Sequence, residues 1–395
     1  MIDKFTDVFK RFFESEKIAG LFLLFCTIIS LIIANSSVGA SYIHFMHRTI
    51  NLSFVGVALN LSIEQWVNDG LMAIFFLMVG LEVKRELLIG ELASFSSAIL
   101  PVAAAIGGMI VPSLIHFAFN HGTPTQSGFA IPMATDIAFA LGILSLAGNK
   151  VPTAVKVFLA ALAIIDDIGA VLVIAFFYTS TISFIHLGAA LGIFLLLLVF
   201  NKLQIKRLFL YIIPGIVMWY CLLKSGVHAT IAGVLLGFAI PFNTRGRNIS
   251  YKLQHALHKP VTFIIVPIFA LVNTAIPLPG GSIANTLSGA NALGIIFGLF
   301  IGKVSGIFLF PYLLTKTGKA SLQEGITWRS LLGLGFLGGI GFTMSMFISN
   351  LAFNDEQTII TSKLSILIAS ALSAITGLLI FNINAYAAKR KDVQA

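Results

Sequence analysis

The chain has 395 residues, of which 57% are apolar and only 10% are charged, and its mean hydropathy is +0.97. Soluble domains carry about 25% charged residues, so the composition excludes an ordinary soluble enzyme. The formal charge of +9 does not indicate a nucleic-acid partner, because the basic residues lie in short segments between apolar blocks. Cys26 and Cys221 lie inside such blocks and predict no disulfide, transition-metal site or redox cofactor.

The apolar blocks are long enough to cross a hydrocarbon core of about 30 Å as helices. An all-α polytopic membrane protein is therefore expected, and residues 1–395 are predicted to form a single transmembrane domain. Residues 1–17 form its N-terminal segment and residues 387–395 its tail. The twelve predicted spans are 18–34, 66–85, 98–117, 128–147, 152–177, 183–200, 208–222, 227–241, 260–276, 291–314, 330–350 and 358–386.

The Lys and Arg residues are concentrated in alternate loops between these spans. Only Arg48, Lys224 and Lys363 fall on one side, and Lys303 lies within a span. By the positive-inside rule the other side is cytoplasmic, and it contains both termini. Omitting one of the short spans, 208–222 or 227–241, would reverse the later loops and break this rule. No small-residue cleavage site follows the first span, so the N-terminus is predicted to be uncleaved.

The first external loop, residues 51–63, contains a short alternating stretch at 60–63 and Gly56 for a turn. These features predict a small extramembrane β-hairpin. An exposed strand edge offers unpaired backbone groups to a second copy, so a homodimer through this loop is expected.

Two spans are poor continuous helices. Span four contains Pro132, followed by Thr135 and Asp136, and span eleven contains five glycines in nine residues before Thr343. Membrane helices tolerate Gly and Pro for packing, but two such spans that cross in opposite directions favour an inverted-topology repeat. We therefore expect helices 3–5 and 10–12 to be related and helices 4 and 11 to be discontinuous.

Broken helices expose partial charges of about half a unit at each broken end. Asp136 and Lys303 have suitable signs to compensate such ends, which would be a structural role that needs no substrate. A transport role for the same two residues stays open at this point.

Asp166 and Asp167 lie in the middle of span five and give the strongest functional signal in the chain. A central charge costs about 2.5–3.5 kcal/mol on insertion scales, so a pair without function would be a large penalty. A salt bridge to Lys303 could neutralise one aspartate but would leave the other. Two close carboxylates resist ionising together, so the pair can hold either a proton or a small cation.

The candidate ligands around this pair are all oxygens. Asp166, Asp167 and the Thr135 hydroxyl, together with carbonyls at the helix breaks, suit a hard cation such as Na⁺ or Li⁺. The sequence thus predicts a cation and proton site at Asp166 and Asp167, in which each ion displaces the other.

Other readings of these residues remain open. A sodium-coupled symporter of organic anions could use similar crossed helices. An intramembrane aspartyl protease or a magnesium-dependent prenyl transferase could use two aspartates, but protease dyads come from separate spans and prenyl transferases need spacing that DDIGA lacks.

Six motifs, in order and spacing, resemble the NhaA family of sodium/proton antiporters over nearly the whole chain. They are GLEVKREL, ATDIAFALG, IIDDIGA, SGVHAT, FIGK and GGIGFTMSMF. The resemblance implies a non-enzymatic secondary transporter of the bacterial inner membrane, with twelve helices, helices 4 and 11 unwound where they cross, and a dimer joined through the first external hairpin. It also implies electrogenic export of Na⁺ or Li⁺ in exchange for H⁺, active at alkaline pH, without a cofactor. With that resemblance we expect alternating access around the aspartate pair, with two protons entering for each Na⁺ leaving.

The resemblance also assigns roles to individual residues. Asp166 and Asp167 match the cation and proton site, with Asp167 the more direct ligand, whereas Asp136, Thr135 and Lys303 match residues that support the crossing. The positions linked to pH response are Glu82, Arg85, Glu86, His228, His255 and His258. From composition alone, the first three and the last two would form a solvated juxtamembrane face, and His228 would be a helix-end residue. Gln254 departs from the family's acidic residue before His255, which leaves the pH threshold open.

Overall fold

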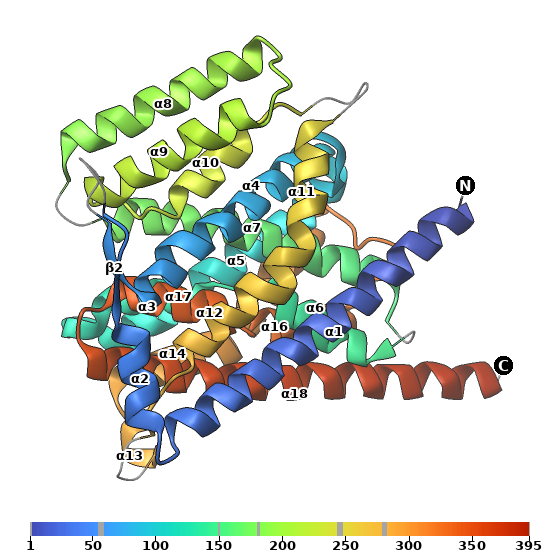
Figure 1. The fold of residues 1–395 in the computed structure, drawn as a ribbon. Coiled ribbons are helices and arrows are strands. Elements are labelled where there is room, and N and C mark those ends of the chain that lie inside the picture. Colours follow the sequence, from blue (N-terminus) through green and yellow to red (C-terminus); the bar gives the residue numbers. More distant parts are fainter. Residues whose placement is uncertain are drawn as a thin grey trace. The chain divides into compact units, whose positions relative to one another are not determined.

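The computed structural model describes residues 2–53, 59–148, 151–179, 182–242, 248–278 and 283–394 (Figure 1). Helices account for most of these residues, and the strands form one two-stranded sheet. The chain divides into two compact units. The first contains Met1–Phe25, Glu91–Ala170 and Leu278–Ala395, and the second contains Cys26–Gly90 and Val171–Pro277. The division falls within α1 (Ile2–Ala34) and within α7 (Thr153–Phe177).

The first unit carries all the charged residues that the sequence places inside spans four, five and ten. Its further elements are η2 (Glu91–Ala93), α5 (Phe95–Asn120), the 3₁₀ helix η3 (Pro124–Met133), α6 (Ile137–Leu146), α13 (Ile283–Leu287), α14 (Ala290–Phe297), the π-helical turn η6 (Gly298–Gly302), α15 (Lys303–Lys316), α16 (Trp328–Gly338), α17 (Phe342–Ala352) and α18 (Glu356–Gln394). Helices α5 and α15 approach each other so closely that a Cβ on Gly306 would overlap the carbonyl of Gly107. Small residues at a contact permit such an approach.

The second unit is organised around the helix pair α4–α10. Its further elements are α2 (Gly39–His47), β1 (Thr49–Asn51), β2 (Asn60–Ser62), α3 (Ile63–Gln65), the π-helical turn η1 (Trp66–Leu71), α4 (Met72–Ile89), α8 (Phe184–Lys202), α9 (Phe209–Ser225), α10 (Ile231–Ala239), α11 (Ile249–Pro260), the π-helical turn η5 (Val261–Ile265) and α12 (Val266–Asn273). Lys84 of α4 donates to the carbonyls of Phe238, at 2.7 Å, and Ile240, at 2.5 Å, at the end of α10. A cation at this end also complements the helix dipole.

The first external loop contains an antiparallel pair of strands, with Thr49 opposite Ser62 and Asn51 opposite Asn60. Ser62 then caps α3 through a reciprocal capping box with Gln65. The strand pair begins two residues before the predicted hairpin range, and Gly56, the predicted turn residue, lies outside the described residues.

Seven helices in the described part of the chain are long and apolar enough to cross a membrane, and there are up to nine if each of two bent pairs is one span. All twelve predicted ranges overlap a described helix, but the count of twelve spans is not confirmed. Helix α9 has 17 residues and α10 only 9, so length alone cannot establish that either crosses a membrane. The chain is a multi-pass membrane protein by this criterion.

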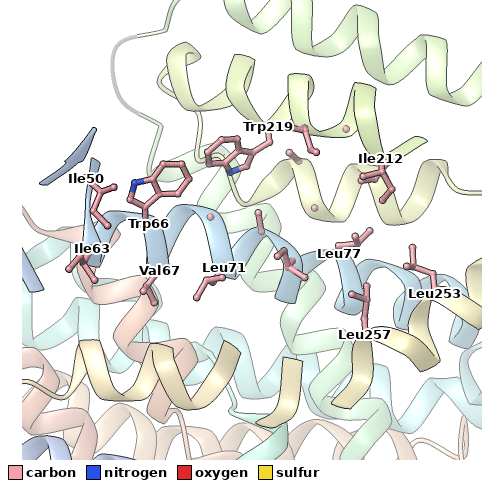
Figure 2. Close-up of a pocket in the computed structure, with 18 residues that line it drawn as sticks. Ile50, Ile63, Trp66, Val67, Leu71, Leu77, Ile212, Trp219, Leu253 and Leu257 are labelled. Atoms are coloured by element: carbon pink, nitrogen blue, oxygen red, sulfur yellow. The ribbon is translucent and has the colours of Figure 1, made fainter. Parts of the chain in front are cut away.

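An apolar cavity of about 660 Å³ lies within the second unit (Figure 2). Trp66 and Trp219 stack at one part of it with their ring centroids 6.0 Å apart, and the Trp219 Nε1–H donates to the Asp69 carbonyl at 2.8 Å. The residues that line it include no charged side chain. It therefore offers no carboxylate to an inorganic cation, and a cation site must lie elsewhere.

The α4–α10 contact gives a first test. We expect Gly233→Ala to destabilise the protein by about 1–3 kcal/mol, because the new methyl group would overlap the Ala73 carbonyl. Gly188→Ala is the matched control, since a Cβ at Gly188 of α8 would meet no atom of another element within 4 Å in the described part of the chain, and alanine is the better helix former. Thermal unfolding of the purified protein in detergent compares the two, and equal stability would contradict this packing.

Candidate cation and proton site

Two bent helices form the centre of the first unit. The pair η3–α6 bends by 47° and the pair α16–α17 by 45°, each across a short break. Pro132 lies one residue before the end of η3, and Gly338 ends α16. The breaks touch directly, because the Asp136 N–H donates to the carbonyl of Ile340 at 2.7 Å. Each break thus supplies a backbone group that the other can bond.

Asp136 joins the first turns of two helices. Its Oδ1 accepts from the Phe139 N–H at 2.9 Å, which makes it the N-cap of α6. Its Oδ2 accepts from the backbone N–H of Thr343 at 3.2 Å and from the Thr343 hydroxyl, at the start of α17. A carboxylate is well suited to both positions, because helix N-termini carry partial positive charge and N–H groups without intrahelical acceptors. These contacts at the starts of α6 and α17 are the ones that a carboxylate compensating two broken helix ends would make.

Asp166 and Lys303 form a fully buried ion pair. The Nζ of Lys303, on the first residue of α15, donates to Oδ2 of Asp166 at 2.6 Å and also to the carbonyl of Met133 at the end of η3. The Thr135 hydroxyl lies 2.7 Å from the same Oδ2 and 2.9 Å from the Gly338 carbonyl. The pair is thereby held between the two breaks. Such contacts are needed, because each buried charge costs several kcal/mol when uncompensated.

Asp167 is also buried, with 1% of its surface exposed. It follows Asp166 in α7, so the two side chains point about 100° apart around the helix. Lys303 also acts electrostatically on Asp167. Together Asp166, Asp167 and Lys303 place two carboxylates and one ammonium group in a small volume.

The six residues assigned to pH response lie in the second unit. Arg85 pairs with Glu86 at 2.8 Å and lies 3.9 Å from Glu82 on the same helix, α4. His258 of α11 interacts electrostatically with Arg85 and with His255. These five residues form one group. His228 instead lies before α10, where its Nε2 is 2.9 Å from the Tyr178 carbonyl.

Sequence reasoning missed two partners of the buried charges. Thr343 stood next to a glycine-rich break, a position that favours helix capping, but it was not assigned to the site. The Met133 carbonyl has no side-chain signal at all. It is available to Lys303 because the chain at the adjacent break leaves helical geometry.

The sequence of the chain is similar to that of known proteins along most of its length. The sequence profile of the family described as Na⁺/H⁺ antiporter 1 matches residues 10–381. The chain belongs to this Na⁺/H⁺ antiporter family. Its members are transporters, not enzymes, and the organic-anion symporter considered above is not supported.

Individual antiporters agree with this assignment. The Na(+)/H(+) antiporter NhaA of Flavobacterium psychrophilum is 55% identical over 95% of both chains, and NhaA 1 of Clostridium beijerinckii is 52% identical over 96% of both. The solved structure of the sodium proton antiporter MjNhaP1 from Methanocaldococcus jannaschii at pH 8 has a TM-score of 0.50 and 16% identity. It covers 94% of this chain and 90% of that one. At that identity the likeness concerns the fold alone.

The Asp136–Thr343 contact gives a test within this antiporter. Thr343→Val keeps the shape of the side chain but removes the hydroxyl donor, so we expect a loss of about 1–3 kcal/mol in stability and reduced exchange. Thr343→Ser keeps the hydroxyl and should retain most of both. Thermal unfolding and Na⁺-induced proton movement in vesicles measure the two effects. Equal behaviour of the two variants would contradict a hydrogen-bonding role.

Proposed function

We propose that this chain is an electrogenic antiporter that exports Na⁺ or Li⁺ from the cytoplasm in exchange for external protons. The observation that carries the proposal is the buried group of Asp166, Asp167 and Lys303 beside two broken helices. Family membership supports Na⁺ and H⁺ as the transported ions. We assign both ions to Asp166 and Asp167, because these two carboxylates are buried in this group.

The charges of the site explain why one ion replaces the other. With Lys303 protonated and both aspartates ionised, the site carries one net negative charge in an apolar interior. Binding of one Na⁺ or one H⁺ brings it to neutrality, so each ion lowers the affinity for the other. The Lys303–Asp166 ion pair leaves Asp167 as the carboxylate that exchanges its proton for Na⁺ most directly.

Oxygen ligands are available to a bound Na⁺ near the pair. Asp167 would supply one carboxylate and Asp166 the other, since Oδ1 of Asp166 accepts no hydrogen bond from the described residues. The Thr135 hydroxyl lies against Asp166 and adds a neutral oxygen. Hard cations such as Na⁺ and Li⁺ prefer this set of donors.

The exchange is driven by the membrane potential as well as by the proton gradient. When Na⁺ leaves, one proton protonates Asp167 and a second protonates Asp166, which breaks its ion pair with Lys303, so one net positive charge moves inward per cycle. A potential contributes about 2.3 kcal/mol per 100 mV to that step. Alkaline conditions favour the ionised carboxylates, and the group formed by Glu82, Arg85, Glu86, His255 and His258, together with His228, would tune this response.

The same proposal includes a membrane arrangement. Twelve helices with both termini cytoplasmic, in a bacterial inner membrane, agree with the distribution of Lys and Arg between the loops. The similar bends of η3–α6 and α16–α17 support inverted repeats of helices 3–5 and 10–12. The exposed strand β1 supports a homodimer formed through the first external loop.

Replacement of Asp167 tests the proposed site. Asp167→Asn keeps the size of the side chain but removes its charge, so we expect Na⁺-induced proton movement in everted vesicles to fall to background. Asp355→Asn is the control, because Asp355 is exposed and its pKa is lowered by hydrogen bonds from Thr358 at the start of α18. That variant should exchange normally.

The assay is run with Na⁺, Li⁺ and K⁺ across a range of pH. The proposal expects exchange with Na⁺ and Li⁺ that rises with pH, and none with K⁺. Exchange that survives in Asp167→Asn at wild-type rates would overturn the assignment of the site.

A further inference from the structure

The helix that carries Lys303 contains a π-helical turn directly before it. The segments α14, η6 and α15 are continuous, and the Lys303 N–H donates to the carbonyl of Gly298 five residues back. An α-helix would use the carbonyl of Leu299, four residues back. The turn therefore holds one more residue than an α-helical turn. Single π turns of this kind are rare within helices and are frequent at functional sites.

The segment α14–η6–α15 packs against α5 through a row of glycines on both sides of the extra residue. A Cβ on Gly294 would lie 3.0 Å from the His116 ring, a Cβ on Gly302 would lie 2.8 Å from Cα of Pro112, and a Cβ on Gly306 would overlap the Gly107 carbonyl. All three glycines thus contact α5.

A regular helix could not place these glycines in that way. Over the twelve residues from Gly294 to Gly306, an α-helix would turn about 120° beyond three full turns. A turn that absorbs one residue reduces this offset to about 20°. The register on either side of η6 therefore depends on that turn.

Lys303 is the first residue after the turn, and its direction depends on the same register. An error of one residue would rotate the Lys303 side chain by about 100° around the helix axis. Its Nζ would then lose both Asp166 and the Met133 carbonyl, which lie on one side of the helix. The glycine face and the ion pair cannot both be kept without the π turn at this sequence spacing.

The turn is in contact with the second helix break. The Leu299 carbonyl, which the Lys303 N–H does not use, lies against Gly339, and a Cβ at residue 339 would overlap it. The same Cβ would lie 2.8 Å from Oγ of Ser373. Gly333 of α16 differs, because the nearest atoms to a Cβ there belong to side chains, those of Phe381 at 2.8 Å and Ile380 at 3.3 Å, and none belongs to the Lys303 site.

We propose that η6 and Gly339 are positioning elements for the exchange reaction. The π turn sets the register of Lys303, and Gly339 holds the turn by admitting the Leu299 carbonyl against its own Cα. The inference rests on the proposed function in one respect, namely that Lys303 and Asp166 take part in exchange. It assigns no ligand to Gly339, which acts only through Lys303.

The first experiment compares Gly339→Ala with Gly333→Ala. Gly339→Ala must displace the backbone of η6 next to Lys303, so we expect exchange to fall by about 10-fold to 100-fold. Its pH profile should move in the same direction as that of Lys303→Gln. Gly333→Ala should keep the wild-type profile, because the Phe381 and Ile380 side chains can shift. A smaller amount of folded protein would lower the rate without moving the pH profile.

The second experiment changes the length of the turn at Ile301, which is 45% exposed. Deleting Ile301 leaves a regular α turn with both flanks in register, so exchange should be retained. Inserting one alanine after Ile301 adds a second extra residue and should abolish exchange, because it rotates Lys303 by about 100°. If the native helix had no π turn, deletion and insertion would each rotate Lys303 by about 100° and both would abolish exchange.

Two results would overturn the inference. One is a Gly339→Ala variant with the pH profile of Gly333→Ala, and the other is equal loss of exchange on deletion and insertion in variants that reach the membrane. Should the deletion variant not fold, the comparison of Gly339 with Gly333 decides alone. Failure of the proposed function has a different signature, since exchange would then survive in Asp167→Asn.

Discussion

The buried ion pair between Lys303 and Asp166 is the interaction on which the arrangement of the first unit depends. Neither charge is stable alone in an apolar interior, where an unpaired ion costs several kcal/mol. The pair needs further hydrogen bonds, and the break between η3 and α6 supplies them through the Met133 carbonyl and the Thr135 hydroxyl. Breaking the helices creates a second demand, because their new N-termini need an acceptor. Asp136 meets it for α6 and α17 together.

These contacts couple ion binding to the positions of several helices. Asp166 and Asp167 lie on α7, Lys303 lies on α15, and the groups around them come from both breaks. Any ion that changes the charge of the carboxylates also changes the strength of the Lys303 pair. Losing one partner of a buried pair costs about 3–5 kcal/mol, which is enough to shift the balance between two arrangements of the helices. The alternating access expected around α7 would use this coupling.

Much of the site could be predicted from the sequence, because charged residues are rare in apolar blocks. Asp136, Asp166, Asp167 and Lys303 stood out for that reason, and Pro132 marked one break. The sequence could not say which aspartate Lys303 contacts, since adjacent residues differ by about 100° and the register depends on a π turn. The Met133 carbonyl gave no signal, because every residue has a carbonyl. The count of twelve spans stays a prediction, since helices as short as α10 cannot be assigned to a membrane by length.

In the proposed exchange, Na⁺ and H⁺ compete for one buried carboxylate group. This competition is measured by adding Na⁺ to the purified, detergent-solubilised protein in weak buffer and recording the protons released. We expect proton release by the wild-type protein, which decreases at high pH where the carboxylates are already ionised, and none by Asp167→Asn. Saturable Na⁺ binding without proton release near neutral pH would show that the two ions do not compete.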